Sequence, residues 1–271
     1  MSFLDFLITK IIFLVNAFFS FGKREIEPGI YSINKKTKLN LRRYTTDMFV
    51  VWEIFRQRSY EKKPSFNIFP GDVVVDVGAH AGVFSVWAAQ KAYQGRVYAY
   101  EPDPENYRYL ENNKRLNKLD NLFIHNLAVG RQKGELNLYL SSYNTGGHSL
   151  YRVPGDEKAK SLIVRVVDLA EIFSSNKLEK INFLKIDAEG AEYEIILNAP
   201  TDLLHRIDRI VLEYHDYLFQ NHDDYGISGI PNYNYLELKN FLEKQGFEIK
   251  IGGSVFKRKI FKLGLLYARK Q

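Results

Sequence analysis

The stretch that decides the fold is VVVDVGAHAGVFSVWAA, residues 73–89. Its apolar run ending at Asp76 predicts a buried strand, the residues from Gly78 to Gly82 predict a tight turn, and the apolar residues that follow recur at helical spacing. Glycine lets a backbone adopt conformations closed to other residues and approach a ligand closely. The stretch therefore predicts a strand–turn–helix unit, either with a ligand at the turn or as an ordinary structural unit.

A second acid, Glu101, closes the next apolar run, Arg96–Tyr100. In nucleotide-binding βαβ units an acid at this place accepts hydrogen bonds from ribose hydroxyls. His80 stands where the dinucleotide fingerprint GxGxxG requires a glycine, so a pyrophosphate has less backbone room. The pattern favours an adenosine ligand without phosphates, and S-adenosylmethionine is the obvious candidate.

The composition excludes several kinds of site. The chain has 271 residues, 45% of them hydrophobic and 14% aromatic, which is enough for a sizeable core. It contains no cysteine, so disulfides, thiolate zinc sites and cysteine nucleophiles are excluded. The net charge of +6 favours anionic partners in general, namely nucleic acid, acidic glycans or anionic lipid. We expect a cytoplasmic protein, since the lack of cysteine suits a reducing compartment.

Residues 1–22 predict an amphipathic helix with a narrow polar face. At 100° per residue, the polar residues other than Lys10 fall within a stripe of roughly 60°: Ser2, Asp5, Thr9, Asn16 and Ser20. Such a helix would be roughly 28 Å long, near the thickness of a bilayer core. It could lie on a membrane surface, pack on protein or span the bilayer, and its polar residues make spanning costly. A surface location on the inner face of the membrane is favoured by the basic residues that follow: Lys23, Arg24, Lys35, Lys36, Lys38, Arg42 and Arg43.

The rest of the chain predicts a cap, residues 23–66, and a main domain, residues 67–271. The cap reads as a hairpin of Ile30–Ile33 and Lys38–Leu41 followed by a helix over Asp47–Arg58. It is too small for a core of its own, so it should pack against the main sheet.

Beyond Glu101, predicted strands and helices alternate, which favours a mostly parallel α/β sheet covered on both faces. The expected strands are Leu122–Ala128, Gly134–Leu140 (in a hairpin), Leu162–Val166, Ile181–Ile186, Arg209–Leu212, Phe247–Ile251 and Leu263–Ala268. The last two follow each other without a helix, so we expect an antiparallel last strand. The polar loop Ser141–Lys160 has the length of a functional loop.

Acids and a histidine stand at the ends of predicted strands: Asp76, Glu101, Asp187, Glu213 and His215. Parallel sheets bind ligands at the carboxyl ends of their strands, so these residues should gather at one edge. The alternative is that such carboxylates cap helices, as Asp187 could, and that Glu189 and Glu192 merely suit a helix dipole.

Several stretches, taken together, resemble the FkbM-type family of class I S-adenosylmethionine-dependent methyltransferases. They run in order from about residue 45 to 215: TTDMFVVWEIF, VVVDVGAHAGVFSVWAA, VYAYEPDPENYRYLENN, NLAVG, VRVVDLAEI, FLKIDAEGAEYEIIL and IVLEYH. The resemblance implies a Rossmann-like, doubly wound seven-stranded sheet with a reversed last strand. It also implies O-methylation of a sugar, polyketide or similar small molecule.

The resemblance also implies roles for individual residues. The methionine and ribose end of the cofactor would be lined by Asp76, Gly78, Ala79, His80 and Gly82. Glu101 would hold the ribose hydroxyls with Pro102 shaping the turn, Asn126 and Ala128 would lie by the adenine, and Asp187 would lie near the sulfonium and the acceptor. The stretch 146–149, Gly-Gly-His-Ser, would belong to a loop over the acceptor.

A methyl acceptor that is a hydroxyl has to lose a proton. His215 is our first candidate for the base, because histidine titrates near neutrality, and His148 and Asp187 come next. A structural hydrogen bond at the strand end is the alternative for His215. A divalent ion held by Asp187 and Glu213 is also conceivable, since oxygen-rich sites suit Mg²⁺.

The sequence thus favours O-methylation of a glycan, glycolipid or other small molecule, with a membrane surface as a partner. N- or C-methylation by the same fold, or a non-catalytic adenosyl-binding scaffold at a membrane, remain as alternatives. Nucleic acid is less favoured as a partner, because the basic residues are scattered and no recognition module is evident. The oligomeric state is left open.

Overall fold

The computed structural model describes residues 28–42, 45–142, 144–152, 156, 158–219, 233–253 and 262–271. The elements, in chain order, are β1 (Pro28–Ser32), β2 (Lys38–Arg42), α2 (Asp47–Val51), the π-helical η1 (Trp52–Gln57), the 3-10 turns η2 (Ser59–Glu61) and η3 (Pro64–Phe66), β3 (Val73–Val77), α3 (Val83–Lys91), β4 (Arg96–Tyr100), α4 (Pro104–Leu116), β5 (Leu122–His125), β6 (Ala128–Val129), β7 (Gly134–Leu140), β8 (Lys160–Val167), α5 (Leu169–Ser175), β9 (Phe183–Ile186), α6 (Glu192–Leu197), α7 (Thr201–Leu204), β10 (Arg209–His215), the 3-10 turn η4 (Asp216–Phe219), α8 (Tyr235–Lys244), β11 (Phe247–Ile251) and β12 (Leu263–Lys270).

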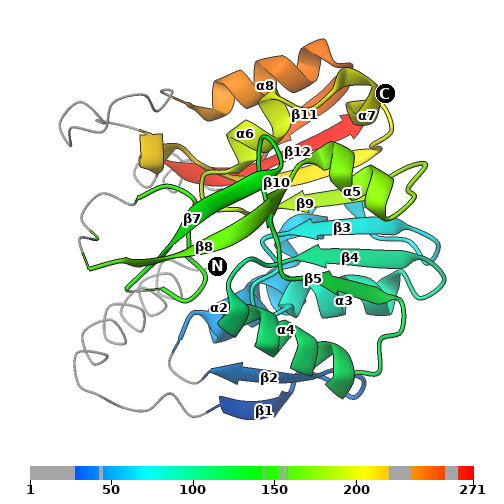
Figure 1. Cartoon of the computed structure of the whole chain (residues 1–271). Helices are drawn as coiled ribbons and strands as arrows, with labels where there is room; N and C mark the ends of the chain where they lie inside the picture. The colour runs from blue at the N-terminus through cyan, green and yellow to red at the C-terminus, as the bar shows by residue number, and fades with distance from the viewer. Residues whose placement is uncertain are drawn as a thin grey trace.

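Seven strands form the central sheet, in the order β11-β12-β10-β9-β3-β4-β5 (Figure 1). β3, β4, β5, β9 and β10 pair in parallel, whereas β12 runs antiparallel to both of its neighbours, β10 and β11. The Rossmann-like α/β fold with a reversed last strand is therefore confirmed.

Helices cover both faces of this sheet, which explains why its inner strands read as continuous apolar runs. Alternate residues of β3 face opposite ways: Val74 joins the core beneath α3 and α4, and Val75 joins the core beneath α5, α6 and α8. Asp76 is the next residue of this strand, and it too is buried. A buried carboxylate needs polar partners, and those of Asp76 are Lys185 and Ser85.

A smaller sheet of three strands, in the order β6-β8-β7, lies beside the central one (Figure 1). The predicted hairpin of Gly134–Leu140 is confirmed as β7, which pairs antiparallel with β8. The prediction of one strand over Leu122–Ala128 is wrong, because β5 ends at His125 and Ala128 begins β6 in the smaller sheet. The chain leaves the central sheet at Asn126, so Ala128 is not at the end of its third strand.

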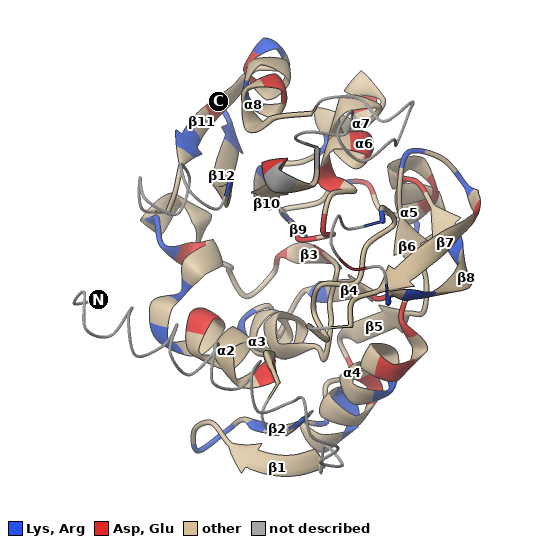
Figure 2. Ribbon diagram, turned by 90° about the vertical axis from the view of Figure 1, so that its left-hand side faces the viewer, with Lys and Arg blue, Asp and Glu red and all other residues tan. Residues whose placement is uncertain are grey.

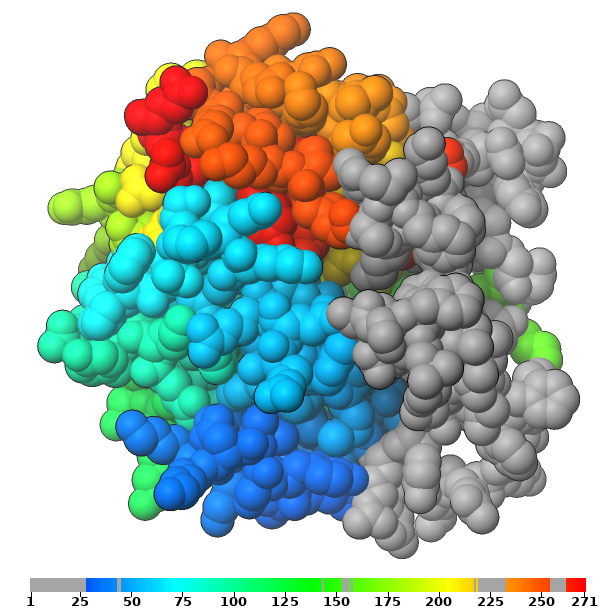
Figure 3. Space-filling model, turned by 180° about the vertical axis from the view of Figure 1, so that it is seen from behind, coloured from blue at the N-terminus to red at the C-terminus, as the bar shows by residue number. Residues whose placement is uncertain are grey.

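The N-terminal hairpin packs along α4 (Figure 1), and it forms the lower edge of the face seen from behind in Figure 3. The buried Asn113 of α4 accepts a hydrogen bond from the N–H of Asn40 in β2, and its amide donates to the carbonyls of Asn40 and Ala81. This one side chain links the hairpin to the turn after β3. The boundaries proposed for the cap and the main domain stay predictions, and residues 1–22 lie outside the described part of the chain.

Arg42 differs from the expectation that it supports binding to a membrane. Its side chain is 2% exposed and forms an ion pair with the fully buried Asp47 at 3.1 Å, so it is turned into the protein. Among the described residues, no helix combines the length and apolar character needed to cross a bilayer.

Candidate active site

The turn after β3 brings the backbones of three neighbouring strands together. The N–H groups of Gly78 and Ala79 both donate to the carbonyl of Tyr100, at 3.1 and 3.0 Å. Gly78 has a φ of +73°, and a Cβ there would lie 1.7 Å from the carbonyl oxygen of Asp187. Gly78 therefore allows the ends of β3 and β9 to meet.

Gly82 likewise allows the turn to pack closely against α4. Its φ is +81°, and a Cβ would lie 2.4 Å from Cδ1 of Leu110 on α4. We expected Gly78 and Gly82 to let a ligand approach the backbone. At both positions the chain itself fills the space that a Cβ would take, so its own packing is sufficient to require these glycines.

Asp76 and Lys185 form a buried ion pair beneath this turn. They are opposite each other in the pairing of β3 with β9, and Nζ of Lys185 lies 3.0 Å from Oδ1 of Asp76. Ser85 donates to the other carboxylate oxygen at 2.5 Å, and Lys185 also donates to the carbonyl of Gly78 at 2.7 Å. Burial lowers the pKa of Lys185, but the carboxylates of Asp76 and Asp187 offset this and raise it overall. Asp76 is fully buried, so it positions the turn from below.

Glu101 lies at the end of β4, and a backbone N–H group donates to each of its carboxylate oxygens. Oε2 accepts from the N–H of His80 at 2.7 Å, and Oε1 accepts from the N–H of Asp103 at 2.9 Å. The side chain is 5% exposed. Burial raises its pKa to about 7, although both backbone hydrogen bonds act in the opposite direction. Each oxygen keeps acceptor capacity for a further donor.

Asn126 and Pro102 shape the surroundings of Glu101. The amide of Asn126 donates to the carbonyl of Glu101 at 2.8 Å and to the carbonyl of Pro102 at 2.9 Å. The chain leaving β5 is thereby fixed against the turn after β4. Asn126 thus lies beside Glu101, and its expected place by the adenine stays a prediction, while the buried Ala128 belongs to the smaller sheet.

His80 occupies the centre of the glycine turn with a φ of +53°, a conformation that is uncommon for a residue with a side chain. Its ring is directed to the cap, where the guanidinium of Arg42 lies 2.9 Å from Nε2 and Oδ1 of Asp47 lies 3.3 Å away. Burial lowers the pKa of His80 to about 4, so the ring is neutral at physiological pH. The backbone N–H of His80 therefore donates to Glu101, whereas its ring contacts Arg42 and Asp47 of the cap.

The loop around residues 144–149 lies over this part of the site. The amide of Asn106 donates to the carbonyl of Thr145 at 2.9 Å, and the hydroxyl of Ser149 donates to the carbonyl of Glu189 at 2.5 Å. Nδ1 of His148 accepts from the N–H of Ser141 at 3.1 Å, while Nε2 lies 3.8 Å from Asp103. His148 thus lies on the Glu101 side of the site.

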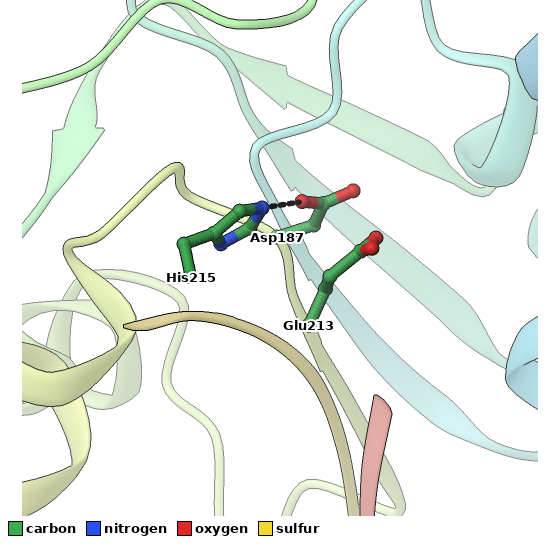
Figure 4. Close-up of side chains that lie close together, drawn as sticks. All are labelled: Asp187, Glu213 and His215. Carbon is green, nitrogen blue, oxygen red and sulfur yellow. Dashed lines mark ion pairs between the residues drawn. The ribbon is translucent and has the colours of Figure 1, made fainter. Parts of the chain in front are cut away.

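A cluster of acids surrounds His215 at the ends of β9 and β10, one strand further along the sheet. Asp187 follows β9, Glu213 and His215 alternate on β10, and one potential ligand atom from each lies within 4.8 Å of the others (Figure 4). Figure 2 shows acidic positions on this side of the sheet. The expected gathering of Asp187, Glu213 and His215 is therefore present.

Carboxylates surround His215, our first candidate for the base. Its Nδ1 lies 2.7 Å from Oε1 of the fully buried Glu192, and its Nε2 lies 3.5 Å from Glu189 and 3.9 Å from Asp187. Burial lowers the pKa of His215, but Glu189 and Glu192 offset this and raise it well above its ordinary value. The role of His215 as the base stays a prediction.

Sequence reasoning missed four residues of this region: Tyr60, Lys185, Glu189 and Glu192. The hydroxyl of Tyr60, in the cap, donates to Oδ2 of Asp187 at 2.9 Å. Glu189 and Glu192 were interpreted as acids that suit a helix dipole, but both contact His215. A charged lysine inside the otherwise apolar strand Phe183–Ile186 was the available signal for a buried partner.

The fold and the site define a class. A Rossmann-like sheet with a reversed last strand, a glycine-containing turn after β3 and a buried acid at the end of β4 are features of S-adenosylmethionine-dependent methyltransferases.

Comparison with known proteins places the chain within this class. Residues 76–249 match the model of the methyltransferase FkbM domain. The chain is 25% identical over 224 residues to "Methyltransferase 1" of Beauveria bassiana, covering 75% of this chain and 82% of that protein. It is 25% identical to the 31-O-demethyl-FK506 methyltransferase FkbM of Streptomyces tacrolimicus, covering 62% and 74%. It is 26% identical to the hexuronic acid methyltransferase AglP of Haloferax volcanii, covering 53% and 56%.

The chain belongs to the FkbM methyltransferase family, and it is an S-adenosylmethionine-dependent methyltransferase. The family named from the sequence motifs, the enzyme class and the cofactor are thereby confirmed.

Proposed function

We propose that the protein transfers a methyl group to a hydroxyl oxygen of a sugar or another small molecule. The observation that carries the proposal is the arrangement of Glu101 and the His215 cluster at the ends of strands on either side of β3. Neighbouring strands lie about 4.8 Å apart, so the ends of β4 and β9 are separated by about 10 Å. A ligand of adenosyl size can bridge them.

The residues present fit an adenosyl group better than a dinucleotide. Glu101 offers two oriented oxygens to a ribose diol. Gly78 and Gly82 are crowded by Asp187 and Leu110, which leaves the turn little room for a pyrophosphate. The cofactor supplies an activated methyl group, and the chain has to orient the acceptor and remove its proton.

Of the three residues expected to accept the proton, Asp187 fits best. Oδ2 is held by the hydroxyl of Tyr60, while Oδ1 faces the ring of His215. His215 itself is held between carboxylates, and His148 lies beside Asp103 in the ribose half of the site. We therefore assign orientation to His215 and proton removal to Asp187.

The acceptor class is supported by relatives. The names of the Streptomyces and Haloferax proteins denote methylation of an oxygen in FK506 and methylation of a hexuronic acid. Both are methylations of oxygen-rich small molecules or sugars.

Calorimetry with S-adenosylhomocysteine tests the cofactor site. Glu101→Gln should weaken binding about ten- to a hundredfold, since a charged acceptor of several hydrogen bonds is lost. Glu111→Gln, an exposed acid of α4 that pairs with Arg115, should bind like the wild type. Equal affinity of both variants would defeat the assignment of Glu101.

Mass spectrometry of glycans and lipids from a deletion strain tests the acceptor. We expect a sugar or small molecule lighter by one methylene, with the loss on oxygen. A loss on nitrogen or carbon would favour the alternative chemistry.

A further inference from the structure

The cluster at the ends of β9 and β10 has the chemistry of a metal site. Glu213 and His215 are two residues apart on one strand, so their side chains leave β10 on the same side. Asp187 comes from the next strand, and one potential ligand atom from each of the three lies within 4.8 Å of the others (Figure 4). The donor set is one imidazole nitrogen and two carboxylates.

The spacing of these atoms is compatible with ligands of one ion. Ligands about 2.1 Å from an octahedral ion lie roughly 3 Å apart when adjacent and about 4.2 Å apart when opposite. Nε2 of His215 lies 3.9 Å from Oδ1 of Asp187, which falls in this range, and all three ligand atoms lie within 4.8 Å of one another.

Contacts with further residues orient two of the three side chains, His215 and Asp187. Nδ1 of His215 is bound by Glu192, which is fully buried, so Nε2 faces the other acids. Tyr60 holds Oδ2 of Asp187 and leaves Oδ1 on the side of His215. A histidine that gives one nitrogen to a carboxylate and the other to an ion is the usual arrangement of metal-binding histidines.

The charges of the region also favour a cation. Glu189, Glu192 and Glu213 all act on His215, and Asp187 lies 3.9 Å from its Nε2, whereas Lys185 lies 3.0 Å from Asp76 and 4.0 Å from Asp187. Carboxylate oxygens gathered in this way are the ligands that hard divalent cations prefer.

We propose that Asp187, Glu213 and His215 bind a divalent cation of the Mn²⁺ or Mg²⁺ type beside the methyl-transfer site. Oxygen ligands outnumber nitrogen in the set, which suits these ions better than zinc. The role of the ion rests on the proposed function: the acceptor hydroxyl would become a further ligand, which orients it and makes its proton easier for Asp187 to remove.

Electron paramagnetic resonance of Mn²⁺ added to the full chain without S-adenosylmethionine tests the site. Binding removes the signal of the free ion, so a titration gives the Kd and the number of sites. We expect one site in the wild type, and a loss of affinity of tenfold or more in Glu213→Gln and in His215→Asn. Glu192→Gln, which acts through His215, should lose about ten- to a hundredfold.

Glu194→Gln is the matched control, because Glu194 lies on α6 two residues from Glu192 and is bonded to Tyr233 and Asn198. It should bind Mn²⁺ like the wild type. Glu213→Gln should still bind S-adenosylhomocysteine within about twofold of the wild type, which shows that it is folded.

Absence of Mn²⁺ binding in the wild type, or equal losses in Glu194→Gln and Glu213→Gln, would overturn the metal site. Binding of Mn²⁺ together with a failure to bind S-adenosylhomocysteine would leave the metal site standing and defeat the proposed function instead.

Discussion

Glu101, which we propose to bind the ribose of the cofactor, is also buried. Burial raises its pKa to about 7 in the ligand-free chain. Ribose hydroxyls donate hydrogen bonds that favour the ionised carboxylate, so a bound cofactor should lower this pKa. Because the bound form then holds fewer protons, affinity should rise with pH through about 7 and fall below it.

We expect S-adenosylhomocysteine to bind up to about tenfold more weakly for each pH unit below 7. Calorimetry at pH 6, 7 and 8 measures this change. In Glu101→Gln the dependence should disappear, since the amide does not titrate in this range. A profile that is equally steep in the variant would assign the effect to another group.

The pair of Asp76 and Lys185 predicts a change in stability. Lys185→Met leaves a fully buried carboxylate without its cation, so the free energy of unfolding should fall by about 3–5 kcal/mol. The double variant Asp76→Asn with Lys185→Met should recover part of this loss, because no buried charge is left unpaired. Urea denaturation measures both, and a single-variant loss under about 1 kcal/mol would show that the pair is not what holds the turn.

At the scale of elements, the junction of β3 with β9 depends on Gly78. In Gly78→Ala the new Cβ would meet the carbonyl of Asp187, in addition to the cost of a positive φ. We expect a loss of about 1–2 kcal/mol from the backbone conformation and a further ~1–3 kcal/mol from the clash.

Gly246→Ala provides the comparison, because Gly246 has a φ of +84° and nothing lies within 4 Å of its Cβ position. It should show only the cost of the backbone conformation. Denaturation of both variants separates the two terms. Similar losses in the two would mean that β3 and β9 can move apart without cost.

The elements themselves could be predicted from sequence wherever a strand is buried on both faces. The runs Val73–Val77 and Phe183–Ile186 are apolar except for Asp76 and Lys185, and turns with glycine or acids follow them. The end of β5 could not be found in this way, since apolar residues resume at Leu127 directly after His125 and Asn126, where the chain changes sheets. The change depends on pairing with β8, which begins more than thirty residues after β6.

The candidate site shows the same limit. The positions of Glu101, Asp187, Glu213 and His215 at the ends of predicted strands placed them at one edge of the sheet, as the structure has them. The partner of His215, Glu192, was out of reach because it depends on how α6 packs beside β10. The partner of Asp76, Lys185, could not be predicted either, because it depends on the pairing of β3 with β9.

For the whole molecule, the N-terminal cap is tied to the site through polar side chains. Asn113 joins β2 to the turn at Ala81, Arg42 reaches the ring of His80, and Tyr60 reaches Asp187. The cap thus contacts both the turn after β3 and the cluster around His215. Movement of the cap would alter both regions together, so we expect cap and sheet to act as one unit.

The remaining prediction concerns residues 1–22 and the membrane. The sequence predicts a helix whose polar stripe leaves a wide apolar surface, with Ile11 opposite the stripe and Ser20 on it. Burial of such a surface in a lipid interface is favourable, and Lys23, Arg24 and Lys35 add attraction to anionic lipid. Deletion of residues 1–22 should therefore lower binding to anionic vesicles by about tenfold or more, since burying one large apolar side chain contributes about 1.5–3 kcal/mol. Flotation of the full chain with vesicles containing phosphatidylserine measures this.

Ile11→Glu should reproduce most of the loss and Ser20→Glu little of it, because only the first places a charge in the apolar surface. Equal binding of the full chain, the deletion and Ile11→Glu would show that the apolar surface packs against protein instead.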